Sequence, residues 1–220
     1  MRVLILGATG AAGVLLIEEA LNASHTVVVY ARSPEKLSEE IRDDPRVTIS
    51  KGELDDEPAL SAAMQNIDAI LSALGPSVSR GPFHSSGKPL AHAYSLVIKL
   101  MKTHGVKRLL ALGTPSITDT HDKFSLKMFV IVAGVKTLAY NAWKDVVAIG
   151  ETIRKEGDAL DWTIVRVPLL SDSSDNKFVV GYVGDGKTGV WLTRAGFAAF
   201  TLQELARNEW VKAAPLVTLP

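Results

Sequence analysis

The first residues of the chain carry the pattern that most limits the fold. Residues 3–6 form a branched apolar run, which indicates a strand buried on both faces. The sequence Gly-Ala-Thr-Gly-Ala-Ala-Gly follows at once as residues 7–13, and a helical pattern with Glu18 and Glu19 facing outward covers residues 12–21. A buried strand that turns through glycines into a helix is typical of the first unit of a parallel α/β sheet.

The alternation of strand and helix patterns continues to the end of the chain. Further strands are expected at residues 26–30, 47–50, 69–74, 109–112 and 162–167, with weaker candidates at 178–182 and 190–191. Helices are expected at residues 34–41, 58–64, 90–103, 138–155 and 197–209. We therefore predict a Rossmann-type, doubly wound and mainly parallel sheet with helices on both faces. We expect a single domain over residues 1–220, with the part from about 170 onward on the substrate side.

The glycine spacing in residues 7–13 suits a diphosphate. Gly7 permits a tight turn out of the strand, Gly10 removes a side chain where backbone must approach the phosphates, and Gly13 allows close packing of helix on sheet. The N-terminus of the helix adds unpaired N–H groups and a partial positive charge. We therefore predict a dinucleotide cofactor that contacts Gly7, Thr9, Gly10, Ala11, Ala12 and Gly13.

The end of the second expected strand bears on which dinucleotide is bound. Proteins that bind NAD usually have a carboxylate there for the ribose 2′-hydroxyl. This chain has Arg32 instead, followed by Ser33. A guanidinium can bind a 2′-phosphate through two parallel hydrogen bonds, so we predict NADP(H) rather than NAD(H).

Composition and charge narrow the partners. The chain has 24 basic and 24 acidic residues, so no overall field attracts nucleic acid or an anionic membrane. It has no cysteine, and its five histidines show no metal-ligand spacing, so we expect neither thiol chemistry nor a metal. We expect a cytoplasmic protein with a small-molecule substrate and no nucleic-acid or membrane partner, and a homodimer is possible.

Several of these motifs together resemble the short-chain dehydrogenase/reductase superfamily, in its atypical, NmrA-like NAD(P)H-binding branch. The resemblance covers nearly the whole chain and includes the residue 7–13 loop, Arg32-Ser33-Pro34, and residues 52–56, 73–75 and 161–168. It implies that Glu53 and Leu54 flank the adenine and that Leu74 and Gly75 pass behind the ribose. It also implies that residues around Val167 and Pro168 approach the nicotinamide.

The same resemblance implies a catalytic triad. Tyr140 and Lys144 have the superfamily's Tyr-x-x-x-Lys spacing, which places them on one helical face. A phenol can exchange a proton with a substrate oxygen when a nearby ammonium lowers its pKa, and the lysine also binds the nicotinamide ribose. Thr114 stands where the third, substrate-polarising hydroxyl is expected, with Ser116 as its competitor.

Other segments leave alternatives open. Residues 125–135 are unexpectedly apolar, and they could face the substrate, form a dimer contact, or, most simply, pack on the C-terminal helix. Gly196 replaces an aspartate that braces the C-terminal part in relatives. His84 and His121 lie in loops beyond strand ends, where either could contact substrate.

The sequence therefore favours an NADP(H)-dependent oxidoreductase acting on a carbonyl or alcohol of a small, fairly apolar molecule. One alternative is an NmrA-like redox sensor that binds NADP(H) without turnover and exposes an apolar face around residues 128–132. Another is a flavin or quinone reductase, whose activity would survive loss of the Tyr140 hydroxyl.

Overall fold

The computed structural model describes residues 1–76 and 83–220. Its strands are β1 (Arg2–Leu6), β2 (Thr26–Ala31), β3 (Val47–Lys51), β4 (Ala69–Ser72), β5 (Arg108–Gly113), β6 (Asp161–Arg166), β7 (Leu169–Ser171), β8 (Val179–Gly181), β9 (Trp191–Thr193) and β10 (Leu216–Thr218). Its helices are α1 (Ala11–Asn22), α2 (Glu39–Arg42), α3 (Glu57–Ala63), α4 (Pro89–His104), α5 (Leu126–Leu138), α6 (Tyr140–Glu156) and α7 (Arg194–Arg207), with a short 3₁₀ turn, η1 (Pro34–Lys36).

One large sheet organises the molecule, with the strand order β3-β2-β1-β4-β5-β6-β10-β8. Neighbours from β3 to β10 run parallel, and β8 joins the edge antiparallel to β10. β7 and β9 form a separate parallel pair. The predicted doubly wound fold is therefore confirmed.

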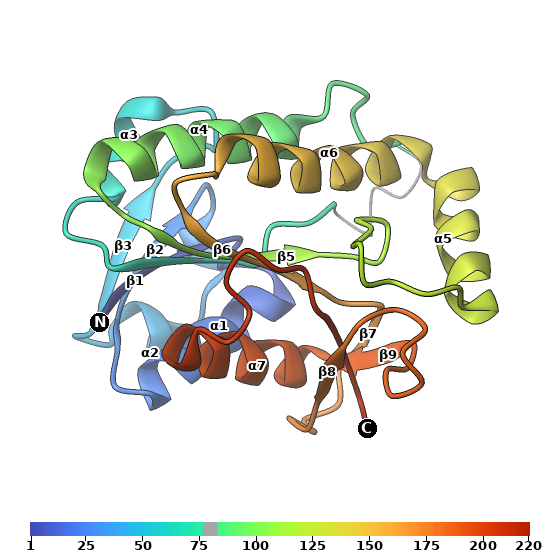
Figure 1. Ribbon diagram of the computed structural model, residues 1–220. Helices are drawn as coiled ribbons and strands as arrows, with labels where there is room; N and C mark the ends of the chain where they lie inside the picture. Colours follow the sequence, from blue (N-terminus) through green and yellow to red (C-terminus); the bar gives the residue numbers. More distant parts are fainter. Residues whose placement is uncertain (77–82) are drawn as a thin grey trace.

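Helices cover both faces of the sheet (Figure 1), with α3, α4 and α6 on one face and α1, α2 and α7 on the other. Each face has its own apolar core. Leu4 and Leu6 of β1 belong to the core under α4 and α6, while Val3 and Ile5 belong to the core under α1 and α7. Because successive side chains of a strand point to opposite faces, β1 feeds both cores and is apolar throughout.

The sheet order reverses direction at β1. Its neighbours are β2 on one side and β4 on the other, so the connections that leave β1 and β4 diverge to opposite faces. In open α/β sheets, ligands bind in the crevice at such a switch point, beyond the carboxyl ends of the strands. The residue 7–13 loop and residues 73–75 both leave the sheet here.

Helix α5 stands apart from the two helix layers. It lies at one end of the molecule, beyond the carboxyl end of β5 and across the start of α6 (Figure 1). Met128 is its one buried residue, and it packs on Val183 and Leu216. The expectation that this apolar segment packs on the C-terminal helix is therefore wrong, since its inner contact is with the β8 and β10 edge.

A threonine braces the C-terminal part in place of the aspartate missing at Gly196. The hydroxyl of Thr193 accepts a hydrogen bond of 2.8 Å from the Gly196 N–H and donates one to the carbonyl oxygen of Asp175. A Cβ on Gly196 would lie 2.9 Å from the Leu192 side chain, 3.0 Å from the Thr193 hydroxyl and 3.1 Å from the Lys177 carbonyl oxygen, so a larger residue would force these neighbours to shift.

Candidate functional site

The loop between β1 and α1 is shaped to receive an anion. Gly7 has a φ of +74°, a conformation that L side chains rarely adopt, and its carbonyl accepts a 3.1 Å hydrogen bond from the Gly10 N–H. A Cβ on Gly7 would lie 2.9 Å from the backbone of Ala73. The structure thus brings the loop against the segment that precedes Leu74 and Gly75.

The two following glycines meet different constraints. A Cβ on Gly13 would lie 2.2 Å from the Gly7 carbonyl oxygen and 2.7 Å from the Ala8 Cα, so helix and loop pack in direct backbone contact. A Cβ on Gly10 would lie 3.4 Å from the same oxygen, which is ordinary contact. Gly10 is exposed, so the absence of its side chain leaves space on the solvent side, where a cofactor phosphate would approach.

The N-terminus of α1 carries no group that competes with an anion. It has no side-chain cap and no acidic residue in its first turn. By contrast, Ser38, Asp56, Ser125 and Thr193 cap α2, α3, α5 and α7 through their side chains. The free N–H groups and helix dipole of α1 therefore remain available to a diphosphate, and the residues present fit the predicted cofactor.

The end of β2 supplies positive charge beside this loop. Arg32 directly follows β2, is exposed, and makes no ion pair or side-chain hydrogen bond within residues 1–76 and 83–220. Lys51 of β3 lies opposite Ala31, one residue before Arg32. Ser33 is half-buried at the start of η1. The predicted 2′-phosphate position is therefore a corner with an uncommitted guanidinium.

A buried tyrosine positions the segment predicted to flank the adenine. The Tyr30 hydroxyl donates a 2.7 Å hydrogen bond to the Glu53 carbonyl oxygen, and a Cβ on Gly52 would lie 2.2 Å from that hydroxyl. Burial, followed by the nearby carboxylates Asp56 and Glu53, raises the pKa of Tyr30 to about 12, so it stays a donor. Sequence reasoning missed Tyr30, although the Gly52 before Glu53 was a signal of close approach.

A second buried tyrosine supports the segment predicted to pass behind the ribose. The hydroxyls of Ser72 and Tyr94 are 2.7 Å apart, and the Ser72 oxygen accepts a 3.3 Å hydrogen bond from the Leu74 N–H. Burial raises the pKa of Tyr94. Leu74 and Gly75 are therefore anchored from below by a contact between β4 and α4, which sequence reasoning also missed.

The residues predicted near the nicotinamide lie at the ends of β5 and β6. The Val167 N–H donates a 3.0 Å hydrogen bond to the Gly113 carbonyl, so Val167 and Pro168 sit beside Thr114. The Thr114 hydroxyl accepts a 3.2 Å hydrogen bond from the Ser116 N–H. Thr114 and Ser116 are both half-buried, so each keeps some access to the crevice.

The structure places Tyr140 and Lys144 on the outer face of α6. Val146, Ile149 and Ile153, spaced three and four residues apart, face the core, whereas Lys144 is exposed and Tyr140 is 52% exposed. The Tyr140 ring stacks on Trp143, with their centroids 5.8 Å apart.

The three triad residues do not come together. In the part of the chain that the structure describes, no hydrogen bond joins Thr114, Tyr140 or Lys144 to one another. The triad therefore stays a prediction, and the orientation of α6 does not support it.

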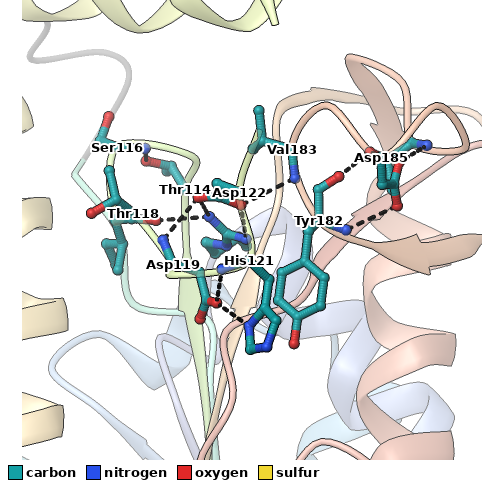
Figure 2. Close-up of polar contacts among 12 residues, drawn as sticks. Thr114, Ser116, Thr118, Asp119, His121, Asp122, Tyr182, Val183 and Asp185 are labelled. Atoms are coloured by element: carbon teal, nitrogen blue, oxygen red, sulfur yellow. Dashed lines mark hydrogen bonds and ion pairs between the residues drawn. The ribbon is translucent and has the colours of Figure 1, made fainter. Parts of the chain in front are cut away.

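A buried ion pair ties the loop after β5 to the C-terminal part. The guanidinium of Arg166 is fully buried and contacts the two Asp122 oxygens at 2.7 and 2.8 Å. Asp122 also accepts hydrogen bonds from the N–H groups of Asp119, at 2.8 Å, and Val183, at 3.1 Å. Figure 2 shows Asp122 between the loop and Val183. This network holds the loop that carries Thr114, and it could not be read from the sequence.

The two histidines considered for substrate contact differ in position. His84 is 9% exposed, and its Nε2 lies 2.8 Å from the Asp145 carboxylate, so its ring serves a structural contact. His121 is exposed and bonds through Nδ1 to Asp119 at 2.8 Å, while its ring stacks on Tyr182 (Figure 2). The structure thus gives His84 a role other than substrate contact.

Comparison with known proteins gives the site its setting. The profile of a family described as NAD(P)H-binding matches residues 7–208. The chain belongs to this family. The resemblance to the atypical branch of the short-chain dehydrogenase/reductase superfamily is thereby confirmed, and the loop between β1 and α1 is the start of an NAD(P)H-binding domain.

Two curated relatives match about a third of the chain. A "Probable pinoresinol-lariciresinol reductase 3" of Arabidopsis thaliana is 36% identical over 75 residues, which cover 33% of this chain and 24% of that protein. "Photosystem II assembly factor Ycf39" of Synechocystis sp. is 37% identical over 73 residues, which cover 33% of this chain and 22% of that protein. The match thus spans about a quarter of the length of these relatives.

Solved structures share the fold at low identity. A short-chain dehydrogenase/reductase from Veillonella parvula in complex with NADP has a TM-score of 0.81 at 15% identity, covering 100% of this chain and 94% of that one. A Rossmann-fold NAD(P)-binding family protein from Shigella flexneri has a TM-score of 0.74 at 21% identity, covering 100% and 93%. The fold that these structures share therefore extends over all of the chain.

Residues 1–76 and 83–220 lack two further features. They contain no helix that is both long and apolar enough to cross a membrane. They also contain no group of three or more metal-ligating side chains.

Proposed function

We propose that this protein is an NADP(H)-dependent oxidoreductase that transfers a hydride between its cofactor and a carbonyl or alcohol group of a small, fairly apolar molecule. One observation carries the proposal. The uncapped, acid-free N-terminus of α1 lies at the end of β1, and the uncommitted guanidinium of Arg32 lies at the end of the neighbouring β2. A cofactor with both a diphosphate and a 2′-phosphate matches these two positive sites.

Each part of the cofactor has residues that would hold it. Gly7, Gly10, Gly13 and the first N–H groups of α1 would receive the diphosphate, and Arg32 with Ser33 would bind the 2′-phosphate. The remaining contacts would come from Thr9, Ala11, Ala12, Glu53, Leu54, Leu74, Gly75, Val167 and Pro168. When bound, the nicotinamide supplies or accepts the hydride.

Reduction of a carbonyl group also requires a proton on its oxygen. The sequence assigns this proton to Tyr140, with Lys144 beside it and Thr114 binding the substrate oxygen. Because Tyr140 and Lys144 lie on the outer face of α6, this assignment requires the first turn of α6 to rotate toward the crevice when substrate binds.

The exposed position of Tyr140 favours a second candidate, a quinone or flavin reductase. After a quinone accepts a hydride, its oxygen can take the proton from water, so no protein acid is needed. The relative named as a reductase is compatible with either candidate.

The experiment follows loss of NADPH absorbance with a panel of aldehydes, ketones, quinones and flavins, for the native protein and Tyr140→Phe. If Tyr140 supplies the proton, the variant loses carbonyl reduction by about a hundredfold or more while NADPH binding persists. If a quinone or flavin is the acceptor, the variant keeps its rate. Glu151→Gln, on the same exposed stripe of α6, is the control.

A different result would contradict both candidates. Tight NADPH binding with no oxidation by any acceptor would favour a redox-responsive module without turnover. Such a module would expose an apolar face around residues 128–132, where Phe129 and Val130 are exposed and Met128 is buried. Absence of binding by either nicotinamide nucleotide would overturn the cofactor assignment itself.

A further inference from the structure

Helix α5 and the residues just before it expose several large apolar side chains to solvent, and the proposed NAD(P)H site does not account for them. Phe124, Leu126, Phe129, Val130 and Leu138 are each between 60% and 80% exposed. Single exposed apolar residues are common, but a contiguous apolar patch on a protein surface usually marks an interaction site. This patch covers the segment from Phe124 to the end of α5, which stands at one end of the molecule (Figure 1).

Lysines flank the exposed apolar side chains of α5. At 100° per residue, Leu126, Phe129 and Val130 form one stripe, while Lys127 and Lys136 lie on its two sides. Lys127 can extend its charged end past the apolar surface while its stem lies along it, whereas the Lys136 ammonium lies over the Trp143 ring, 4.6 Å from its centroid. An exposed apolar stripe flanked by lysines can rest against an anionic membrane interface.

Positive charge is concentrated in and around α5. Although the whole chain is electrically balanced, residues 123–144 contain four lysines and no acidic residue. The four, Lys123, Lys127, Lys136 and Lys144, are all exposed, and none forms an ion pair within the described residues. The nearest carboxylate before them, Asp122, is committed to Arg166.

We propose that Phe124 and α5 form a docking surface for an anionic lipid bilayer. The apolar stripe would enter the boundary between headgroups and acyl chains, and the lysines would contact the lipid phosphates. The balanced total charge led us to expect no membrane partner. That expectation concerned the sum of the charges, whereas a surface responds to the charges closest to it.

The same charges argue against a second copy of the chain as the occupant. A two-fold dimer places the same patch on both partners, so the lysine-rich segments would face each other without a carboxylate between them.

The test uses the full chain and measures co-sedimentation with vesicles of equal parts phosphatidylcholine and phosphatidylglycerol, compared with vesicles of phosphatidylcholine alone. We expect binding to the anionic vesicles that weakens as salt rises, and far weaker binding to the neutral ones. Replacing both border lysines by K127Q and K136Q should weaken binding about thirtyfold. Phe129→Ser should weaken it by about tenfold or more.

Controls keep the result decisive. Trp191→Ser and Lys187→Gln remove an exposed aromatic ring and an exposed lysine outside α5, and they should bind vesicles as the native protein does. NADPH affinity should be unchanged in every variant, which shows that the fold is intact. Absence of vesicle binding, or equal binding to neutral and anionic vesicles, would overturn the proposal. So would light scattering that shows a dimer which Phe129→Ser converts to a monomer.

Discussion

Substitutions at Gly10 and Gly13 can distinguish the effect of the loop on cofactor binding from its effect on the stability of the fold. A methyl group on Gly13 would meet two backbone atoms at 2.2 and 2.7 Å, so α1 would have to move by about 1 Å to reach ordinary contact distance. Overpacking of this kind costs about 1–3 kcal/mol of stability. Gly13→Ala should therefore lose both stability and cofactor affinity.

Gly10→Ala should behave differently. Its methyl group would lie at an ordinary 3.4 Å from the Gly7 oxygen, so stability should fall by no more than about 0.5 kcal/mol. The methyl group would nevertheless occupy the space where the diphosphate approaches, and NADPH affinity should fall about tenfold to hundredfold. Gly134→Ala is the matched control, because nothing lies within 4 Å of its Cβ position. It should gain about 0.5–1 kcal/mol and bind NADPH normally.

Urea unfolding and NADPH fluorescence titration measure the two quantities independently. The pattern to be tested is a loss of affinity alone for Gly10→Ala and a loss of both for Gly13→Ala. Native affinity in a well-folded Gly10→Ala protein would refute the reasoning, since it would show that this glycine does not face the cofactor.

Three further predictions concern charged groups. In fluorescence titration, Arg32→Ala should lower NADPH affinity about tenfold to hundredfold and leave NADH affinity unchanged. Equal losses of affinity for the two nucleotides would contradict the assignment of Arg32 to the 2′-phosphate. Asp145→Asn should lower the free energy of unfolding in urea by about 2–4 kcal/mol. The buried Asp145 carboxylate accepts hydrogen bonds from the N–H groups that begin α4 and from His84. A loss of stability as small as that of Glu151→Gln would contradict this role. Burial opposes ionisation of Asp185, but hydrogen bonds from backbone N–H groups outweigh it and lower its pKa to about 2. The ionised Asp185 carboxylate therefore stabilises the fold above about pH 4, and this stabilisation is lost as the pH falls toward 2. Asp185→Asn should make the free energy of unfolding fall less steeply between about pH 4 and pH 2. The same fall as in the native protein would contradict this prediction.

Local patterns predicted the parts of the fold that depend on neighbouring residues. The buried run at residues 3–6 became β1, and the helix expected at 138–155 became α6, Tyr140–Glu156. The weak strand candidates at 178–182 and 190–191 correspond to β8 and β9. β7 and β10 were missed. Like β8 and β9 they have only three residues, so their own sequence indicates them weakly at best and the partner they pair with defines them.

In the candidate site too, features that depend on neighbouring residues were predicted, whereas contacts between distant segments were not. The glycines, Arg32 and the 73–75 segment lie where the sequence placed them, because strand ends and tight turns are local features. The hydroxyls of Tyr30 and Tyr94, which hold two of the segments predicted to face the cofactor, were missed because each acts on a residue about twenty positions away. The Tyr-x-x-x-Lys spacing correctly put Tyr140 and Lys144 on one face of a helix, but spacing does not say which face packs on the sheet.

What the sequence by itself determined is therefore the sheet, its helices and the glycine loop of residues 7–13, because hydrophobic periodicity and glycine geometry act between residues close along the chain. Only the tertiary structure decided that the start of α6 turns its tyrosine outward, that Arg166 and Asp122 tie the β5 loop to the C-terminal part, and that α5 is left uncovered. These features depend on which distant segments compete for the same buried surface, and that competition is settled only when the whole chain packs.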